Sequence, residues 1–186
     1  VTCFVVKDFD TDSLGTFSGE ISRKDDALTT LRKKCWEGMQ AEGFDLAVAT
    51  EGSFGNHPTV FFAPANDEFI MLIDQKNKLE IVERVLSLDT NFDCSEVSTK
   101  AELKVFLDKV QFPSHGVILK DASENWSKIY KGVSNYDLAE KIFDTIIASG
   151  GGCYIETDMR AMQNPTRMQI IKEVCLKLIN KLHSVC

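Results

Sequence analysis

The sequence has few prolines and histidines, no linker-like stretch and no long apolar run. Only four prolines and three histidines occur among 186 residues, and no Pro/Gly/Ser-rich segment or internal repeat divides the chain. No run approaches the roughly 20 apolar residues that cross a bilayer, which predicts no membrane association. Because no composition shift marks a boundary, we expect a single domain over residues 1–186.

The cysteines lack the spacing of a metal-binding or disulfide framework. None of the six forms a C-x-x-C pair, and 44% of the residues are hydrophobic, enough for a substantial core. These features indicate reduced thiols in a cytoplasmic protein. The first six residues carry no positively charged leader and predict a strand rather than a signal peptide.

The charge balance is acidic, with 21 Lys and Arg against 28 Asp and Glu and a formal net charge of −7. This balance argues against nucleic-acid binding by bulk electrostatics, because a polyanion is repelled by a negatively charged protein. Carboxylate oxygens in such a chain suit a divalent cation such as Mg²⁺. Where cationic side chains gather locally, they predict a small anionic or phosphorylated ligand. The sequence does not indicate the oligomeric state.

Hydrophobic periodicity predicts helices alternating with strands. Helical patterns cover residues 25–41, 100–110 and 136–148 and a last segment that begins at Pro165. Thr99 and Glu102 form a capping-box pattern, and Asn135 and Asn164 are expected N-caps. Strand patterns cover residues 3–7, 46–50, 59–63, 69–73, 79–88, 117–120, 128–131 and 153–156.

The order of these segments indicates the fold class. Helices alternate with strands at both ends, and a meander of strands lies between them, which predicts an α/β fold with a mixed twisted sheet and helices on its faces. Residues 75–78 are expected to form a hairpin turn, with Asn77 at positive φ. Residues 66–68 are expected to form the turn before a strand.

An acidic segment follows the first predicted strand. Asp10, Asp12 and Glu20 are candidate metal ligands, because hard carboxylate oxygens near a strand end suit Mg²⁺ or Mn²⁺. The segment is not an EF-hand loop, since Ser13 stands where that loop requires glycine. A solvated acidic loop with Asx turns is the alternative interpretation.

A second candidate segment is ATEGSFGNHP, residues 49–58. Glu51 is expected to project beyond a strand end, where ligands bind in open α/β sheets, as a catalytic and metal-binding carboxylate. Ser53 and His57 are candidate substrate contacts. A Ser53–His57 nucleophile and base pair is an alternative, although the G-x-S-x-G spacing is absent. His57 has a plainer interpretation as a turn residue before Pro58.

The third segment, ETDMRAMQNPTRM, combines carboxylates, guanidiniums and a helix start. Glu156 and Asp158 are candidate metal ligands, and Asp158 is also a candidate catalytic residue. Arg160, Asn164 and Arg167 are candidate substrate contacts, because a helix N-terminus beside arginines suits a phosphate or carboxylate. The alternative is an internal Asp158–Arg160 pair that only supports the loop.

Two isolated residues complete the set of candidate substrate contacts. His115 lies in FPSHG before a predicted strand and is equally consistent with a capping role. Lys131 ends a predicted strand and either reaches an anion or faces solvent.

The motifs DTDSLGTFSGE, ATEGSFGNHP, FPSHG and ETDMRA–NPTRM resemble the bacterial proteins called domain of unknown function 6671, over nearly the whole chain. This family name implies no established activity. The resemblance also implies further residues at both ends, with Lys and His before Val1 and a cysteine-containing tail in which Cys186 is a first zinc ligand. A weaker likeness to inosine and xanthosine triphosphate pyrophosphatases implies metal-binding carboxylates at Glu20 and Glu51.

Two functions follow from these patterns. The first is a Mg²⁺-dependent phosphohydrolase or nucleotide-processing enzyme, with its site at the carboxyl ends of the strands. The second is a non-catalytic module that binds an anionic small molecule, or a structural or interaction domain. Catalysis by a cysteine such as Cys153 is the least favoured enzyme hypothesis.

Overall fold

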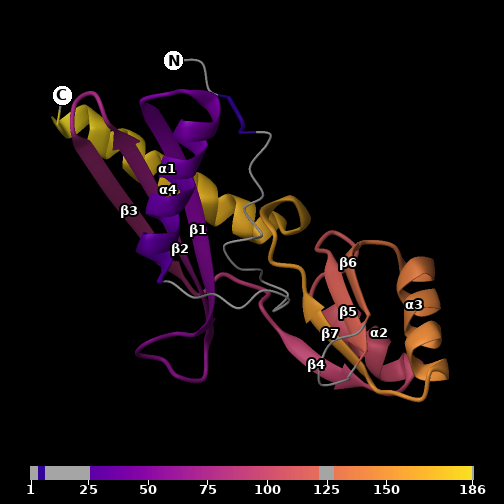
Figure 1. The fold of residues 1–186 in the computed structure, drawn as a ribbon. Coiled ribbons are helices and arrows are strands. Elements are labelled where there is room, and N and C mark those ends of the chain that lie inside the picture. The colour runs from indigo at the N-terminus through magenta and orange to yellow at the C-terminus, as the bar shows by residue number, and fades with distance from the viewer. Residues whose placement is uncertain (1–3, 7–25, 122–127, 186) are drawn as a thin grey trace. The chain divides into compact units, whose positions relative to one another are not determined.

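The computed structural model describes residues 4–6, 26–121 and 128–185, and its ribbon is drawn in Figure 1. In this part of the chain four α-helices and seven strands follow one another as α1 (Ala27–Glu42), β1 (Leu46–Asn56), β2 (Pro64–Asp74), β3 (Leu79–Ser87), β4 (Cys94–Val97), α2 (Lys100–Lys109), β5 (Val117–Asp121), β6 (Ile129–Val133), α3 (Tyr136–Ala148), β7 (Cys153–Thr157) and α4 (Pro165–Val185). A short 3-10 turn, Ala161–Gln163, precedes α4. None of the helices in the described ranges is long and apolar enough to span a bilayer.

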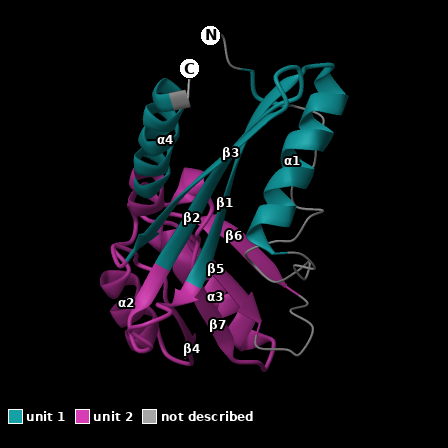
Figure 2. Ribbon diagram, turned by 90° about the vertical axis from the view of Figure 1, so that its left-hand side faces the viewer, with its two compact units in different colours: residues 1–54, 66–87, 170–186 teal, residues 55–65, 88–169 magenta. Residues whose placement is uncertain are grey.

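The chain divides into two compact units, which Figure 2 colours separately. Unit 1 comprises residues 1–54, 66–87 and 170–186, and unit 2 comprises residues 55–65 and 88–169. Helix α4 contributes its first residues to unit 2 and the remainder to unit 1. The expectation of one domain stays a prediction.

Unit 1 is a three-stranded sheet, in the order β1-β2-β3, covered by a helix on each face (Figure 2). Successive residues of β2 point to opposite faces, as strand geometry requires. Met71 and Ile73 pack against the buried face of α1, whereas Ile70 and Leu72 pack against α4. The apolar run of β2 is therefore explained by burial on both sides.

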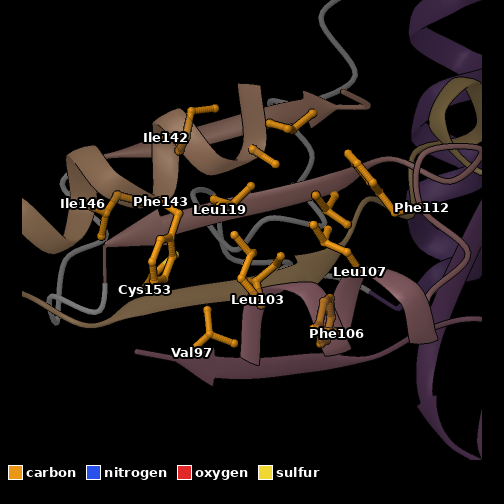
Figure 3. Packing of buried hydrophobic residues seen from close by; sticks show 14 of the residues in the cluster. Val97, Leu103, Phe106, Leu107, Phe112, Leu119, Ile142, Phe143, Ile146 and Cys153 are labelled. Atoms are coloured by element: carbon orange, nitrogen blue, oxygen red, sulfur yellow. The ribbon is translucent and has the colours of Figure 1, made fainter. Parts of the chain in front are cut away.

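Unit 2 is a four-stranded sheet in the order β4-β7-β5-β6, in which every neighbouring pair is antiparallel. Helices α2 and α3 pack on the same face of this sheet. Figure 3 shows Leu103 and Leu107 of α2 and Phe143 and Ile146 of α3 converging on Leu119 and other sheet residues. Because alternate residues face this core, the opposite face carries Ile118, Lys120, Tyr154 and Glu156.

Local sequence signals explain most helix ends. The Thr99 and Glu102 side chains form the predicted capping box of α2. The Asn135 carboxamide accepts the Leu138 N–H at the start of α3, which has the predicted bounds. Gly43 ends α1 with φ of 70° and so adopts the left-handed conformation that glycine favours.

The α/β class with helices on sheet faces is confirmed, and several local predictions are wrong. The strands form two antiparallel sheets rather than one mixed sheet, and β4 was not predicted. Residues 59–63 form a loop instead of a strand, with the Phe62 side chain 91% exposed. Residues 66–68 belong to β2 instead of a turn, and in the hairpin turn Lys78 rather than Asn77 has positive φ.

Candidate functional site

The centre of the candidate site is Asp158, which directly follows β7 in unit 2. Its side chain is completely buried. Oδ1 accepts the Arg160 backbone N–H at 3.1 Å and Nε at 2.9 Å, while Oδ2 accepts Arg160 Nη2 at 2.6 Å and the Gly132 N–H at 3.0 Å. The carboxylate therefore fixes both the loop and the plane of the guanidinium. The Arg160 side chain remains 33% exposed.

Two glycines let this loop approach the ends of β5 and β6. The Gly116 carbonyl accepts the Asp158 N–H, and the Gly116 N–H donates to the Gln163 carbonyl, both at 2.8 Å. A Cβ at Gly116 would lie 2.9 Å from Gln163 Oε1, and one at Gly132 would lie 3.2 Å from Arg160 Nη2. Gly132 also has φ of 67°. The FPSHG segment, the Lys131–Gly132 pair and the loop after β7 thus meet at one place.

The start of α4 is held by Asn164 and Arg167, as the predicted N-cap implies. Asn164 is fully buried, its Oδ1 accepts the Arg167 N–H at 3.0 Å and its Nδ2 donates to Asn91 Oδ1 at 2.8 Å. Arg167 is 5% exposed, and its Nη1 donates to the Met159 carbonyl at 2.6 Å. These contacts lock the helix start to the loop that carries Asp158.

His115 caps the same helix start, and its hydrogen bonds define its tautomer. Nε2 accepts the Thr166 backbone N–H at 3.3 Å, so Nε2 carries no proton. The Ser114 hydroxyl donates its only proton to the Gln111 carbonyl at 2.6 Å, so its 3.0 Å contact with His115 Nδ1 requires an Nδ1–H donor. The ring is therefore neutral and protonated on Nδ1. Burial lowers the pKa of His115, opposed by the Gln111 backbone.

These caps change the interpretation of the helix start. The N–H groups of Thr166 and Arg167, which were expected to receive an anion, donate to His115 and Asn164 instead. The capping alternative for His115 and the internal Asp158–Arg160 pair are the arrangements present. Among the candidate cations of this segment, Arg160 is the one with substantial exposure, since Arg167 is buried.

Glu156 lies within β7, on the sheet face opposite the helices. Its Oε1 is 2.7 Å from the Nζ of buried Lys120, although the geometry between them is not that of a hydrogen bond. Burial raises the pKa of Glu156, and Lys120 opposes the rise. The Lys120 Nζ also lies 5.6 Å from the centre of the Tyr154 ring. Glu156 is therefore engaged in an ion pair on this face, and Lys131 is half-buried in β6.

Glu51 is not at the end of its strand, because β1 continues to Asn56. In unit 1 its carboxylate, 6% exposed, forms an ion pair with Lys34 Nζ of α1 at 2.6 Å. Ser53 is exposed. In unit 2 His57 accepts the N–H groups of Thr59 and Val60 at Nδ1, which agrees with the turn interpretation of this residue.

The predicted magnesium site lies only partly within the described residues. Among them, no group of three or more His, Cys, Asp or Glu side chains is placed to hold a metal ion. Glu51, Glu156 and Asp158 each have a cationic partner, and Asp10, Asp12 and Glu20 lie outside the described residues. A bound Mg²⁺ therefore stays a prediction.

In the comparison with protein families, the chain matches the model described as domain of unknown function (DUF6671) over residues 34–186. This chain belongs to the DUF6671 family. The match covers three of the motifs that carried the resemblance, around Glu51, His115 and Asp158, and it does not include DTDSLGTFSGE at residues 10–20. No curated protein and no solved structure matches the chain, so the likeness to inosine and xanthosine triphosphate pyrophosphatases has no support.

Sequence reasoning missed two buried polar residues on β2, Asn66 and Glu68. Glu68 is completely buried, and Asn66 is 1% exposed. Within residues 4–6, 26–121 and 128–185, neither the Nδ2 nor the Oδ1 of Asn66 has a hydrogen-bond partner. A sequence signal for this part of the strand was present. The Asn-Asp-Glu segment lies directly before the apolar run 69–73, and such a segment is compatible with a strand as well as with a turn.

Replacing Asn66 with Leu is expected to stabilise unit 1 by about 1–2 kcal/mol, because an unsatisfied buried amide costs about that much and leucine has a similar branched shape. Urea denaturation, with amide exchange in β2 and β3 as the local readout, measures the change. Asp67→Leu, on the neighbouring and partly exposed position, is the control and should lose its ion pair with Arg84 without any gain. A clear loss of stability in Asn66→Leu would contradict the assignment of Asn66 as unpaired.

Proposed function

We propose that unit 2 is a binding module for a small anionic ligand and that Arg160 is its principal contact. The observation that carries the proposal is the fully buried Asp158 carboxylate, which accepts the Nε and Nη2 groups of Arg160, whose side chain stays 33% exposed. A guanidinium fixed in this way loses little side-chain freedom when it binds a carboxylate or phosphate. The arrangement is preorganised for an anion rather than for acid–base chemistry.

The charges around Arg160 support an anion. Strands β5, β6 and β7, the loop after β7 and the first turn of α4 carry four cationic residues and three carboxylates, which are Lys120, Lys131, Arg160 and Arg167 against Asp121, Glu156 and Asp158. The local balance is positive, whereas the whole chain carries −7. Local cations in an acidic protein favour a small anion over an extended polyanion, which the rest of the surface would repel.

Binding is tested by thermal shift with inorganic phosphate, pyrophosphate and a panel of nucleotides. A ligand that binds only the folded protein at 100 times its Kd stabilises it by about 2.7 kcal/mol. We expect a shift for at least one anion in the wild type, little or none in Arg160→Gln, and a normal shift in the matched control Arg84→Gln, which removes an arginine with the same two-bond pairing to Asp67. Equal shifts in the two variants would contradict the assignment of Arg160.

The phosphohydrolase hypothesis is a second proposal, and it assigns the catalytic role to Glu51, whose carboxylate is buried in unit 1 with Lys34 beside it. Incubating the protein with nucleoside triphosphates and Mg²⁺, with Glu51→Gln as control, tests it. Turnover that Glu51→Gln abolishes would favour an enzyme, and binding without turnover favours the non-catalytic module.

A further inference from the structure

His115 connects the first turn of α4 to the loop that carries Arg160. We propose that the neutral His115 ring is a pH-sensitive latch, which holds both segments in the anion-binding arrangement and releases them when it is protonated. The proposal rests on the anion-binding function proposed above, and it adds the regulation of that site.

The link to the Arg160 loop runs through the next residue. Gly116 follows His115 directly, and both of its peptide groups bond to the loop, its carbonyl to the Asp158 N–H and its N–H to the Gln163 carbonyl. On the other side of the ring, Nε2 contacts both the N–H and the hydroxyl of Thr166, at 3.3 and 2.9 Å. A displaced imidazole therefore disturbs the helix start and the support of Arg160 together.

Protonation conflicts with this geometry in two ways. A proton on Nε2 removes the acceptor of the Thr166 N–H, which then loses its capping bond. The new charge also lies at the N-terminus of a helix of 21 residues, where the helix dipole disfavours a cation. The Ser114 and Thr166 hydroxyls can rotate, but they supply no negative charge to stabilise an imidazolium.

The charged groups on neighbouring elements do not offset this cost. Arg167 lies on the first turn of α4, Arg160 and Asp158 on the loop after β7, and Asp108, which is exposed to solvent, near the end of α2. The Asp158 carboxylate is occupied by Arg160 and Gly132, and Arg167 is a second cation. Among the described residues, the hydrogen bonds of the imidazole ring are to Ser114 and Thr166. Burial, the main cause, lowers the pKa of His115 below the ordinary value of 6.5.

The direction of the pH effect follows from this lowered pKa. Between the folded pKa and 6.5 the unfolded chain binds the proton more readily than the folded chain does. The contribution of neutral His115 to the free energy of unfolding is therefore complete above pH 6.5. It decreases as the pH falls from 6.5 through the folded pKa. The latch is closed at neutral pH and opens in acid.

Amide exchange on the full chain tests the latch without any ligand. After correction for the intrinsic pH dependence of exchange, the Thr166 and Arg167 amides should exchange faster as the pH falls from 6.5, with a midpoint that coincides with the NMR titration of the His115 ring. In His115→Gln the effect should disappear, and in the control His183→Gln, at the exposed end of α4, it should remain. A pH-independent exchange in the wild type would overturn the latch.

Titration with inorganic sulfate, whose charge is constant between pH 5 and 8, tests the coupling to the site. We expect the sulfate affinity of the wild type to fall about fivefold or more on acidification, and that of His115→Gln to change less. An acid-sensitive helix start with an unchanged sulfate affinity would overturn the regulatory role. Absence of sulfate binding at every pH, with the exchange effect present, would instead count against the proposed anion site. If His115→Gln does not fold, the coincidence of the two wild-type midpoints decides.

Discussion

Replacing Asp158 with Asn is expected to destabilise unit 2 by about 2 kcal/mol, below the ~3–5 kcal/mol of a fully buried ion pair, because the Arg160 side chain is 33% exposed and water screens part of its unpaired charge. The asparagine amide keeps the shape of the carboxylate, but its charge is lost and its NH₂ group faces donors of Arg160 or Gly132. The Arg160 guanidinium is then left without its counter-ion. Native-state amide exchange in β5 and β7 measures the loss locally.

The control is Asp67→Asn in unit 1. Asp67 accepts Nε and Nη2 of Arg84 at 2.6 and 2.7 Å, the same donors that Asp158 accepts from Arg160, but the two side chains are 23% and 50% exposed. An exposed pair of this kind contributes about 0–1 kcal/mol. Equal losses in the two variants would show that burial of Asp158 does not determine its contribution.

Replacing Glu51 with Gln is expected to destabilise unit 1 by about 2 kcal/mol, below the ~3–5 kcal/mol of a fully buried pair, because Lys34 keeps some access to water. The Lys34 side chain is 20% exposed, so solvent screens part of the unpaired charge. Urea denaturation with amide exchange in α1 and β1 gives the value. The loss matters for interpretation, because any activity defect of Glu51→Gln must be corrected for the unfolded fraction.

The double variant Lys34→Met/Glu51→Leu separates the pair from its packing. Replacing both partners of a buried pair by apolar residues is often neutral or stabilising, so the double variant should recover most of the stability lost in Glu51→Gln. Asp144→Asn, which breaks an exposed pair with Lys100, should leave the stability unchanged. A double variant less stable than Glu51→Gln would mean that Glu51 has a structural contact more important than Lys34.

The elements that could be predicted from the sequence are those whose ends are fixed by local chemistry. The capping box at Thr99 and Glu102 and the N-caps Asn135 and Asn164 act within one turn of helix, so three or four residues contain the whole signal. The loop at residues 59–63 shows the limit of such signals. Its β-branched and aromatic residues suggest a strand, but His57 closes a turn around Thr59 and Val60 instead.

The sequence predicted which residues belong to the candidate site, but it did not predict which residues they contact. The sequence showed that Asp158, Arg160, Asn164 and Arg167 lie close to a helix start. It did not show that His115, from a segment 51 residues away from Thr166, supplies the cap and so removes that N-terminus as an anion site. The pairing of Glu51 with Lys34 and the burial of Asn66 depend equally on which strand and helix lie beside them, and no local pattern encodes this.

The most direct test of the account is NMR mapping of pyrophosphate binding to the wild-type chain, alongside Arg160→Gln and Arg84→Gln. We predict saturable shifts that centre on the Gly132, Arg160 and Gln163 amides, that vanish in Arg160→Gln and that persist in Arg84→Gln. Shifts that centre on other residues, or that survive unchanged in Arg160→Gln, would contradict the claim that Asp158 holds Arg160 as an anion receptor.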